Sequence, residues 1–99
     1  MILVTGSVTA REDSFDEVQR VSLEHVHRSR LEPGCLAHAV HVDCENPLRL
    51  VFVEQWADRA ALGTHFAVPA SRDFVRALKT LAAGASTVEI FDAARVENL

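Results

Sequence analysis

The sequence has no tyrosine, a single tryptophan, two cysteines and only four glycines among its 99 residues. Without tyrosine, no mechanism can use a phenolic side chain as its proton donor. The glycines form neither a phosphate-binding loop nor a Gly-x-Gly-x-x-Gly motif, and no Gly-x-Ser-x-Gly elbow is present. Nucleotide cofactors and serine hydrolysis therefore lack the motifs that they require.

The two cysteines, Cys35 and Cys44, are too far apart in the sequence for a Cys-x-x-Cys redox or zinc motif. If residues 35–43 form one strand, they lie near its opposite ends, roughly 30 Å apart at about 3.3 Å per residue. A disulfide cannot bridge that distance. We expect both thiols to be reduced.

Neither a basic cluster nor a long hydrophobic run is present. Ten Lys and Arg residues stand against 14 Asp and Glu, a net charge of -4, which disfavours nucleic acid and anionic lipid as partners. Apolar runs such as Leu50 to Val53 are far shorter than the roughly 20 residues that cross a bilayer. Met1 to Val4 has no basic leader and soon reaches Thr5, which predicts a first strand and not a secretory signal. We expect a cytoplasmic protein.

A chain of 99 residues has room for one hydrophobic core, so we predict a single domain over residues 1–99. Its 48% hydrophobic and 24% charged residues are typical of a folded globular protein. So short a chain buries only about 60–65% of its unfolded surface. Sharing apolar surface with a partner would therefore stabilise it.

Hydrophobic periodicity predicts four strands, at residues 2–10, 35–43, 49–56 and 87–96. Helical periodicity and N-cap residues predict one helix from about Ser14 to Glu32, a short one from Asp58 to Phe66, and one from Ser71 to about Ala83. Gly6, in the middle of the first strand, indicates a bulge or a close approach to another segment.

The order β-α-β-β-α-β is the split βαβ pattern of ferredoxin-like α+β domains, a four-stranded antiparallel sheet with helices on one face. Several of the predicted strands carry apolar residues on both faces, although the helices can cover only one. An exposed apolar sheet face is unusual for a monomer. The pattern therefore predicts a homodimer formed through the second sheet face.

The five histidines show no spacing that indicates a metal site. His25, His38, His41 and His65 include no His-x-x-x-His pair, and His25 and His27 point to different sides of their predicted helix. A metal cage is therefore not expected.

Trp56 and His65 are candidates to line one cavity. Trp56 ends the third strand, and His65 follows nine positions later in the short helix. An indole offers a flat apolar wall to an aromatic ligand, and an imidazole can take or give a proton near neutral pH. The alternative is that Trp56 anchors the core and His65 is a core or subunit-contact histidine.

Glu54 shares a strand face with Phe52 and Trp56, so its carboxylate is expected to be partly buried and to need a partner. A structural ion pair is the simpler interpretation. His38, on the neighbouring strand, is a second candidate for the pocket. Further candidate lining residues lie on the predicted helices: His25, Leu62, Phe66 and Phe74.

Several short motifs follow one another in a specific combination: Ser29-x-x-Glu32-Pro33-Gly34-Cys35-Leu36, Asn46-Pro47, Phe52-Val53-Glu54-Gln55-Trp56, and Ala61-Leu62-x-x-His65 with Phe74. In this order they resemble the antibiotic biosynthesis monooxygenase (ABM) domain family. The resemblance spans residues 2 to about 92.

The resemblance implies a dimeric α+β barrel and a cofactor-independent monooxygenase that oxidises a small quinol or a polycyclic phenol or anthrone with O2. It implies Trp56 as an aromatic wall and His65 or His38 as the base. A deprotonated, electron-rich phenol can itself pass an electron to oxygen, so the protein need only orient, deprotonate and desolvate it. The chain departs from the family at His38, often a tyrosine, and at Pro69-Ala70-Ser71, often Pro-His-Phe.

Two alternatives stay open at this point. One is a non-catalytic dimer that binds an aromatic ligand in the same pocket. The other is the haem-degrading branch of the superfamily, in which a histidine on this helix binds iron near a tryptophan. That branch usually supplies an asparagine from the first strand, where this chain has Thr5, Gly6 and Ser7.

Overall fold

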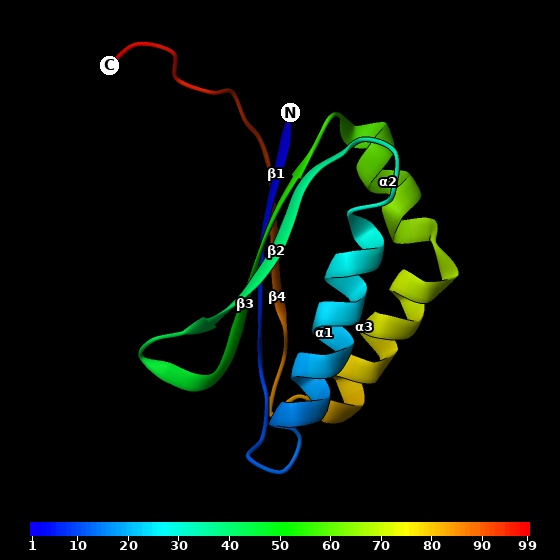
Figure 1. Cartoon of the computed structure of the whole chain (residues 1–99), viewed down its shortest axis with the longest axis vertical. Helices are drawn as coiled ribbons and strands as arrows, with labels where there is room; N and C mark the ends of the chain where they lie inside the picture. The colour runs from blue at the N-terminus through cyan, green and yellow to red at the C-terminus, as the bar shows by residue number, and fades with distance from the viewer.

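The protein forms two layers, with a four-stranded antiparallel sheet on one side and three helices on the other (Figure 1). The computed structural model describes all residues, 1–99. The elements are β1 (Ile2–Thr9), α1 (Phe15–Ser29), β2 (Cys35–Asp43), β3 (Asn46–Trp56), α2 (Arg59–Ala67), α3 (Pro69–Leu81) and β4 (Thr87–Asp92). The strand order is β2-β3-β1-β4. The predicted ferredoxin-like α+β fold is confirmed.

The start of α1 is tied to the end of α3. Of the two residues that the sequence suggests as N-cap, Asp13 and Ser14, it is Ser14 that occupies this position of α1, but its hydroxyl makes no capping bond to that helix. Instead it donates to the carbonyl oxygen of Leu81 at 2.7 Å. Asp16 and Glu17 in the first turn complement the positive end of the helix dipole. The two long helices are therefore pinned together at one end.

The two later helices begin in different ways. Asp58 caps α2 as predicted, because its side chain accepts a hydrogen bond from the Ala61 amide at 2.8 Å. The prediction that Ser71 caps α3 is wrong, since the helix begins at Pro69 and Ser71 lies buried inside it. Proline suits the first helical position because its φ is already helical and its missing N–H would have no partner there.

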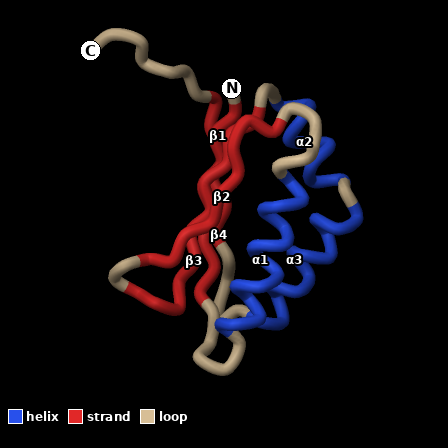
Figure 2. The backbone as a smooth tube through the Cα atoms, viewed as in Figure 1, coloured by secondary structure: helices blue, strands red, loops and turns tan.

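Two strand boundaries also differ from the prediction. β4 ends at Asp92 and not near residue 96, because Asp92 pairs with Ile2 and the neighbouring strand begins there. β3 begins at Asn46 and not at Arg49, because Asp43 pairs directly with Asn46 around a tight turn. The turn is closed by a hydrogen bond from the Glu45 amide to the Asp43 side chain. In Figure 2 the tip of this hairpin bends away from the helices, on the other side of the sheet.

The helices do not cover the whole face of the sheet. On β1 and β3 the side chains that face the helices are buried, including Val4, Val8, Leu50 and Phe52. On the edge strand β4, Val88 and Ile90 pair opposite Gly6 and Val4 and so face the same side. They are nevertheless 61% and 50% exposed. One edge of the covered face is thus left open.

The opposite face of the sheet carries no helix (Figure 1). Val51 and Val53 of β3 are only half-buried there, and Phe91 of β4 is 44% exposed. The expected homodimer through this face stays a prediction. Cys35 and Cys44 are both free thiols. None of the three helices has the length and apolar character that crossing a lipid bilayer requires.

Gly6 marks a close approach between strands and not a bulge. The pairing of β1 with β3 and β4 runs through it without a register shift. A Cβ at this position would lie 2.9 Å from the carbonyl oxygen of Thr87 in β4. The backbone of β4 leaves no room for a methyl group.

Replacing Gly6 by alanine is therefore expected to lower the free energy of unfolding by about 1–3 kcal/mol through overpacking. Gly63→Ala is the matched control, because a Cβ in this exposed turn of α2 would meet nothing within 4 Å. It should raise stability by about 0.5–1 kcal/mol. Urea unfolding of the two variants would measure both, and equal stabilities would show that the β1–β4 contact is not tight.

Candidate active site

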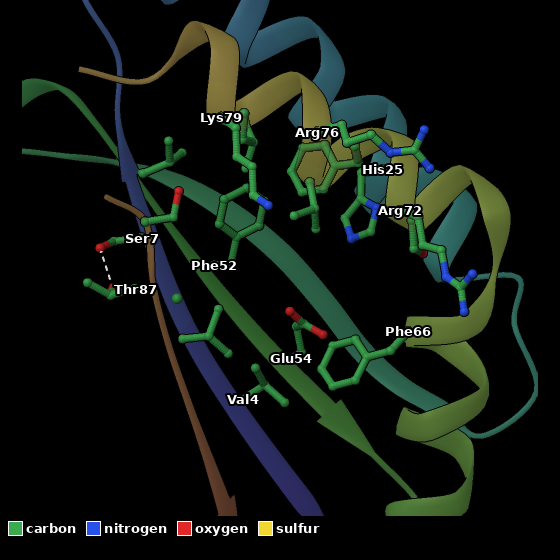
Figure 3. A pocket seen from close by; sticks show the side chains of 18 of the residues that line it. Val4, Ser7, His25, Phe52, Glu54, Phe66, Arg72, Arg76, Lys79 and Thr87 are labelled. Carbon is green, nitrogen blue, oxygen red and sulfur yellow. Dashed lines mark hydrogen bonds between the residues drawn. The ribbon is translucent and has the colours of Figure 1, made fainter. Parts of the chain in front are cut away.

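A pocket of about 870 Å³ lies where the helices leave the sheet edge open. Its walls come from β1, β3, all three helices and residues 84–88, and apolar surface predominates on them. Figure 3 shows Phe52 and Glu54 of the sheet on one side and His25 and Phe66, from α1 and α2, on the other. His65 also lines it. The pocket therefore combines aromatic walls with a few buried polar groups, as small-molecule sites usually do.

His65 is held by a carboxylate from another part of the chain. It is 3% exposed, and its Nδ1 lies 2.9 Å from Oε1 of Glu32. Because an ionised carboxylate can only accept, Nδ1 carries the hydrogen and donates it. The other ring nitrogen, Nε2, keeps a free lone pair. This arrangement of carboxylate and imidazole is the one that orients a general base.

Gly34 brings Glu32 to His65. Its φ of +83° is left-handed, and a Cβ there would lie 2.5 Å from the Cβ of Ala61 in α2. Only glycine fits both constraints without strain. The loop after α1 can therefore pack directly on α2, and this places the Glu32 carboxylate beside the ring of His65.

His25 is held by a hydrogen-bond donor, whereas His65 is held by an acceptor. Its Nδ1 lies 2.7 Å from Nη2 of Arg28, one turn further along α1. A guanidinium can only donate, so Nδ1 accepts and the ring hydrogen of the neutral imidazole is on Nε2. The ring also stacks on Phe74, with centroids 4.1 Å apart and planes 10° apart. Both its plane and its tautomer are therefore fixed.

Burial lowers the pKa of His25 to about 3, assisted by the nearby His38, His65 and Arg28 and opposed by Glu54. Charging this imidazole would require removing it from water among other basic groups. His25 is therefore neutral at ordinary pH.

Glu54 links two buried side chains behind the pocket floor. Its Oε1 accepts a hydrogen bond from the Trp56 indole at 2.9 Å, and Nε2 of His38 lies 3.2 Å from the same oxygen. The His38 approach is poorly aligned, and neither nitrogen of that ring has a well-directed hydrogen bond. Burial alone would raise the pKa of Glu54, but His38 and the indole N–H together hold it below its usual value. The carboxylate is ionised.

His25, His38 and His65 form the group of side chains that could hold a metal ion. One ring nitrogen from each lies within 4.8 Å of the others, and all three rings are buried. Their spacing in the sequence does not indicate a site, because they come from three different elements, α1, β2 and α2. Tetrahedral zinc with bonds of about 2.0 Å needs nitrogens about 3.3 Å apart, so the rings would have to close around an ion.

Comparison with known proteins identifies the family. A model described as "antibiotic biosynthesis monooxygenase" matches residues 1–77. The chain belongs to the antibiotic biosynthesis monooxygenase family. The resemblance inferred from the sequence motifs is therefore confirmed.

Solved structures and one curated relative match nearly the whole chain. A crystal structure of an antibiotic biosynthesis monooxygenase is 33% identical, with a TM-score of 0.88, and the match covers 96% of this chain and 100% of that one. A Deinococcus radiodurans structure, proposed to be such an enzyme, is 24% identical, with a TM-score of 0.94 and coverage of 100% and 98%. An uncharacterised Synechocystis protein is 31% identical over 98 residues, covering 99% of this chain and 67% of that protein.

In this ABM domain the candidate residues fall into two groups. His38, Trp56 and Leu62 do not line the pocket. Trp56 is fully buried, and its ring lies 4.5 Å from that of His65, so it supports His65 from behind. The candidates that line the pocket are His25, Phe52, Glu54, His65, Phe66 and Phe74.

Sequence reasoning missed several ABM site residues. Glu32 belongs to the Glu32-Pro33-Gly34 motif, which predicts only the end of a helix, and no motif indicates Arg28. Arg72, Arg76 and Lys79 of α3 also line the pocket. Their spacing of four and three places them on one helix face, a signal that the sequence does contain.

The depressed pKa of His25 makes a prediction about stability. Between about pH 6.5 and pH 3 the unfolded chain binds a proton at this residue and the folded chain does not. The free energy of unfolding should therefore rise with pH across that window, with a slope from this residue of up to about 1.4 kcal/mol per pH unit. Above about pH 6.5 the contribution is constant.

Urea unfolding at several pH values would test this prediction. His25→Phe keeps a ring stacked on Phe74 but cannot titrate, so it should lose part of the rise of the unfolding free energy with pH. His27→Phe is the matched control, because His27 is exposed on the same helix. It should follow the wild type. A slope unchanged in His25→Phe would show that His25 titrates normally in the folded state.

Proposed function

We propose that this protein is a cofactor-independent monooxygenase that oxidises a small quinol or a polycyclic phenol or anthrone with O2. The observation that carries the proposal is the buried pair of Glu32 and His65. The carboxylate holds Nδ1–H of the imidazole at 2.9 Å and leaves its other nitrogen for a ligand in an aromatic-walled pocket. Membership of the family adds independent support.

His65 is the base in this proposal. Its Nε2 takes the proton of the substrate hydroxyl, and Glu32 stabilises the imidazolium that forms. His38, the other candidate, does not line the pocket and has the Glu54 carboxylate beside it. We therefore assign it a supporting role in the polar layer behind the pocket floor.

Oxygen chemistry then follows from the substrate itself. Once ionised, an electron-rich phenol passes an electron to O2, and the two resulting radicals combine on carbon. For an anthrone, the reacting methylene loses two hydrogens and gains one oxygen atom, while the second oxygen atom leaves as water. The protein contributes orientation, deprotonation and exclusion of water.

The pocket walls support an aromatic substrate. Phe52, Phe66 and Phe74 come from β3, α2 and α3 and line the same pocket. Its volume of about 870 Å³ can accommodate two or three fused rings. Phe66 is 47% exposed, which places an aromatic ring where a substrate would enter.

Oxygen uptake by metal-free protein with a panel of hydroquinones and anthrones would test the activity. We expect turnover above the protein-free rate, and a decrease of about 10²–10⁴-fold in kcat for His65→Ala, the usual contribution of a general base. His41→Ala is the control, because His41 is an exposed histidine of β2. Rates equal to the protein-free control and unaffected by His65→Ala would contradict the proposal. Tight ligand binding without turnover would indicate the non-catalytic aromatic-binding dimer.

We also propose that two copies associate through the sheet face that has no helix. Val51 and Val53 lie on that face, opposite to the buried Phe52, and are only half-buried in one copy. A small domain gains stability by covering such surface. The open β4 edge lies beside the pocket, so a second copy could also help to close it.

Sedimentation velocity at micromolar concentration should then show a dimer, which Val53→Lys should dissociate by placing a charge in the apolar interface. Leu23→Lys is the control, since Leu23 is 40% exposed on α1, in the layer on the other side of the sheet. A wild-type protein that is monomeric under these conditions would contradict the dimer.

A further inference from the structure

The pocket contains two histidines whose ring hydrogens are fixed on opposite nitrogens. His65 gives its Nδ1–H to Glu32, which leaves Nε2 as an acceptor. His25 accepts from Arg28 at Nδ1, which leaves Nε2–H as a donor. Both rings line the pocket, and their centroids are 5.2 Å apart. One nitrogen that can remove a proton thus lies beside one that can only donate a hydrogen bond.

We propose that His25 is the hydrogen-bond donor for the ionised oxygen of the ligand, that Arg28 is the positioning residue that fixes its tautomer, and that the pocket therefore selects hydroxy-aromatic compounds bound as phenolates. This inference rests on the proposed function, because it assigns the atom that the substrate presents to His65. It adds a donor and a positioning residue to the base.

The proton balance is simple. The ligand O–H bond breaks, its proton moves to Nε2 of His65, and the electron pair stays on the ligand oxygen. His65 becomes an imidazolium paired with the Glu32 carboxylate. The new negative charge on oxygen is stabilised by the His25 Nε2–H, which is already oriented before the ligand binds. Such preorganised donors are the usual means by which a protein stabilises an oxyanion.

The packing around His25 fits a fixed donor. Phe74 stacks on the ring at 4.1 Å, so the ring cannot easily rotate. Burial keeps the ring neutral, with a pKa of about 3. A doubly protonated ring would have to break the contact with the Arg28 guanidinium, whereas the neutral ring satisfies it.

The same geometry argues against a metal ion at the three histidines. To ligate through Nε2, His25 would have to move its hydrogen to Nδ1, where the Arg28 guanidinium already points a hydrogen at 2.7 Å. Two donors would then face each other. The ring nitrogens, up to 4.8 Å apart, would also have to contract.

Charged and titratable groups near this position come from every neighbouring element. Glu32, Glu54 and His38 lie on the loop after α1 and on β3 and β2, while three cations line the pocket from α3. Those cations, Arg72, Arg76 and Lys79, favour an anionic ligand. Glu54 opposes one, but Trp56 and His38 are already beside its carboxylate.

A probe that resists oxidation separates this inference from turnover. We would titrate the protein with 4-nitro-1-naphthol, whose phenolate absorbs in the visible range, and with its methyl ether, which cannot ionise. The wild type is expected to bind the phenolate and to lower the apparent pKa of the bound naphthol by one unit or more relative to the free compound. Both quantities are read from absorbance as pH is varied.

His25→Phe keeps the stacked ring and removes the donor. It should lower phenolate affinity at least tenfold and change methyl ether affinity less than twofold. Arg28→Met should lower phenolate affinity about threefold or more, and ¹⁵N NMR should show His25 partly as the Nδ1–H tautomer. Arg28→Lys keeps a donor beside Nδ1, so both the phenolate affinity and the Nε2–H tautomer should recover. Arg20→Met is the matched control, because it removes the same charge from α1 outside the pocket lining.

Equal phenolate affinity in wild type and His25→Phe, or an Nδ1–H tautomer in the wild type, would overturn the inference. Tight Co²⁺ binding through the three rings would also overturn the inference, because it requires an unprotonated Nε2 on His25. Such binding would give a d–d absorption spectrum that is lost in His25→Phe. A pKa shift of the bound naphthol without oxygen uptake from any quinol would sustain the inference and remove the oxygenase proposal. Oxygen uptake without that pKa shift would sustain the oxygenase proposal and overturn the inference about His25.

Discussion

The site depends on the contact between Glu32 and His65. A buried carboxylate is stable only when it is paired or hydrogen-bonded, and a buried imidazole needs a partner that fixes its tautomer. Oε1 of Glu32 and Nδ1 of His65 satisfy each other at 2.9 Å, whereas Oε2 of Glu32 is buried without a hydrogen-bond partner. Gly34 allows the loop to approach α2 closely enough for this contact, because a side chain at that position would collide with Ala61. The geometry of a single turn thereby determines which nitrogen of His65 faces the pocket.

The incomplete cover of the sheet accounts for the pocket. The helices bury the central strands but leave β4 uncovered, so Val88 and Ile90 are exposed on the face where Val4 is buried. A domain of this size has too few helices to cover both edges of one face and none for the other face. The open edge beside the pocket and the bare second face of the sheet therefore have the same origin.

Much of the fold could be predicted from the sequence, because hydrophobic periodicity and capping residues act locally. The order of strands and helices and the Asp58 cap agree with the prediction, whereas the predicted Ser71 cap is wrong because Pro69 begins that helix. The sequence motifs indicate both His65 and His38 as candidate bases and contain nothing that distinguishes them. Only their placement, with His65 in the pocket wall and His38 behind it, separates them.

The sequence by itself determined the family, the two-layer architecture and the residue types available for chemistry, since each follows from motifs and periodicities within short stretches of chain. The tertiary structure alone decided which histidine accepts and which donates. Those roles come from partners that periodicity does not specify: Glu32, 33 positions before His65, and Arg28, one turn beyond His25. A tautomer is set by the atom that a ring nitrogen meets, and the fold decides which atom that is.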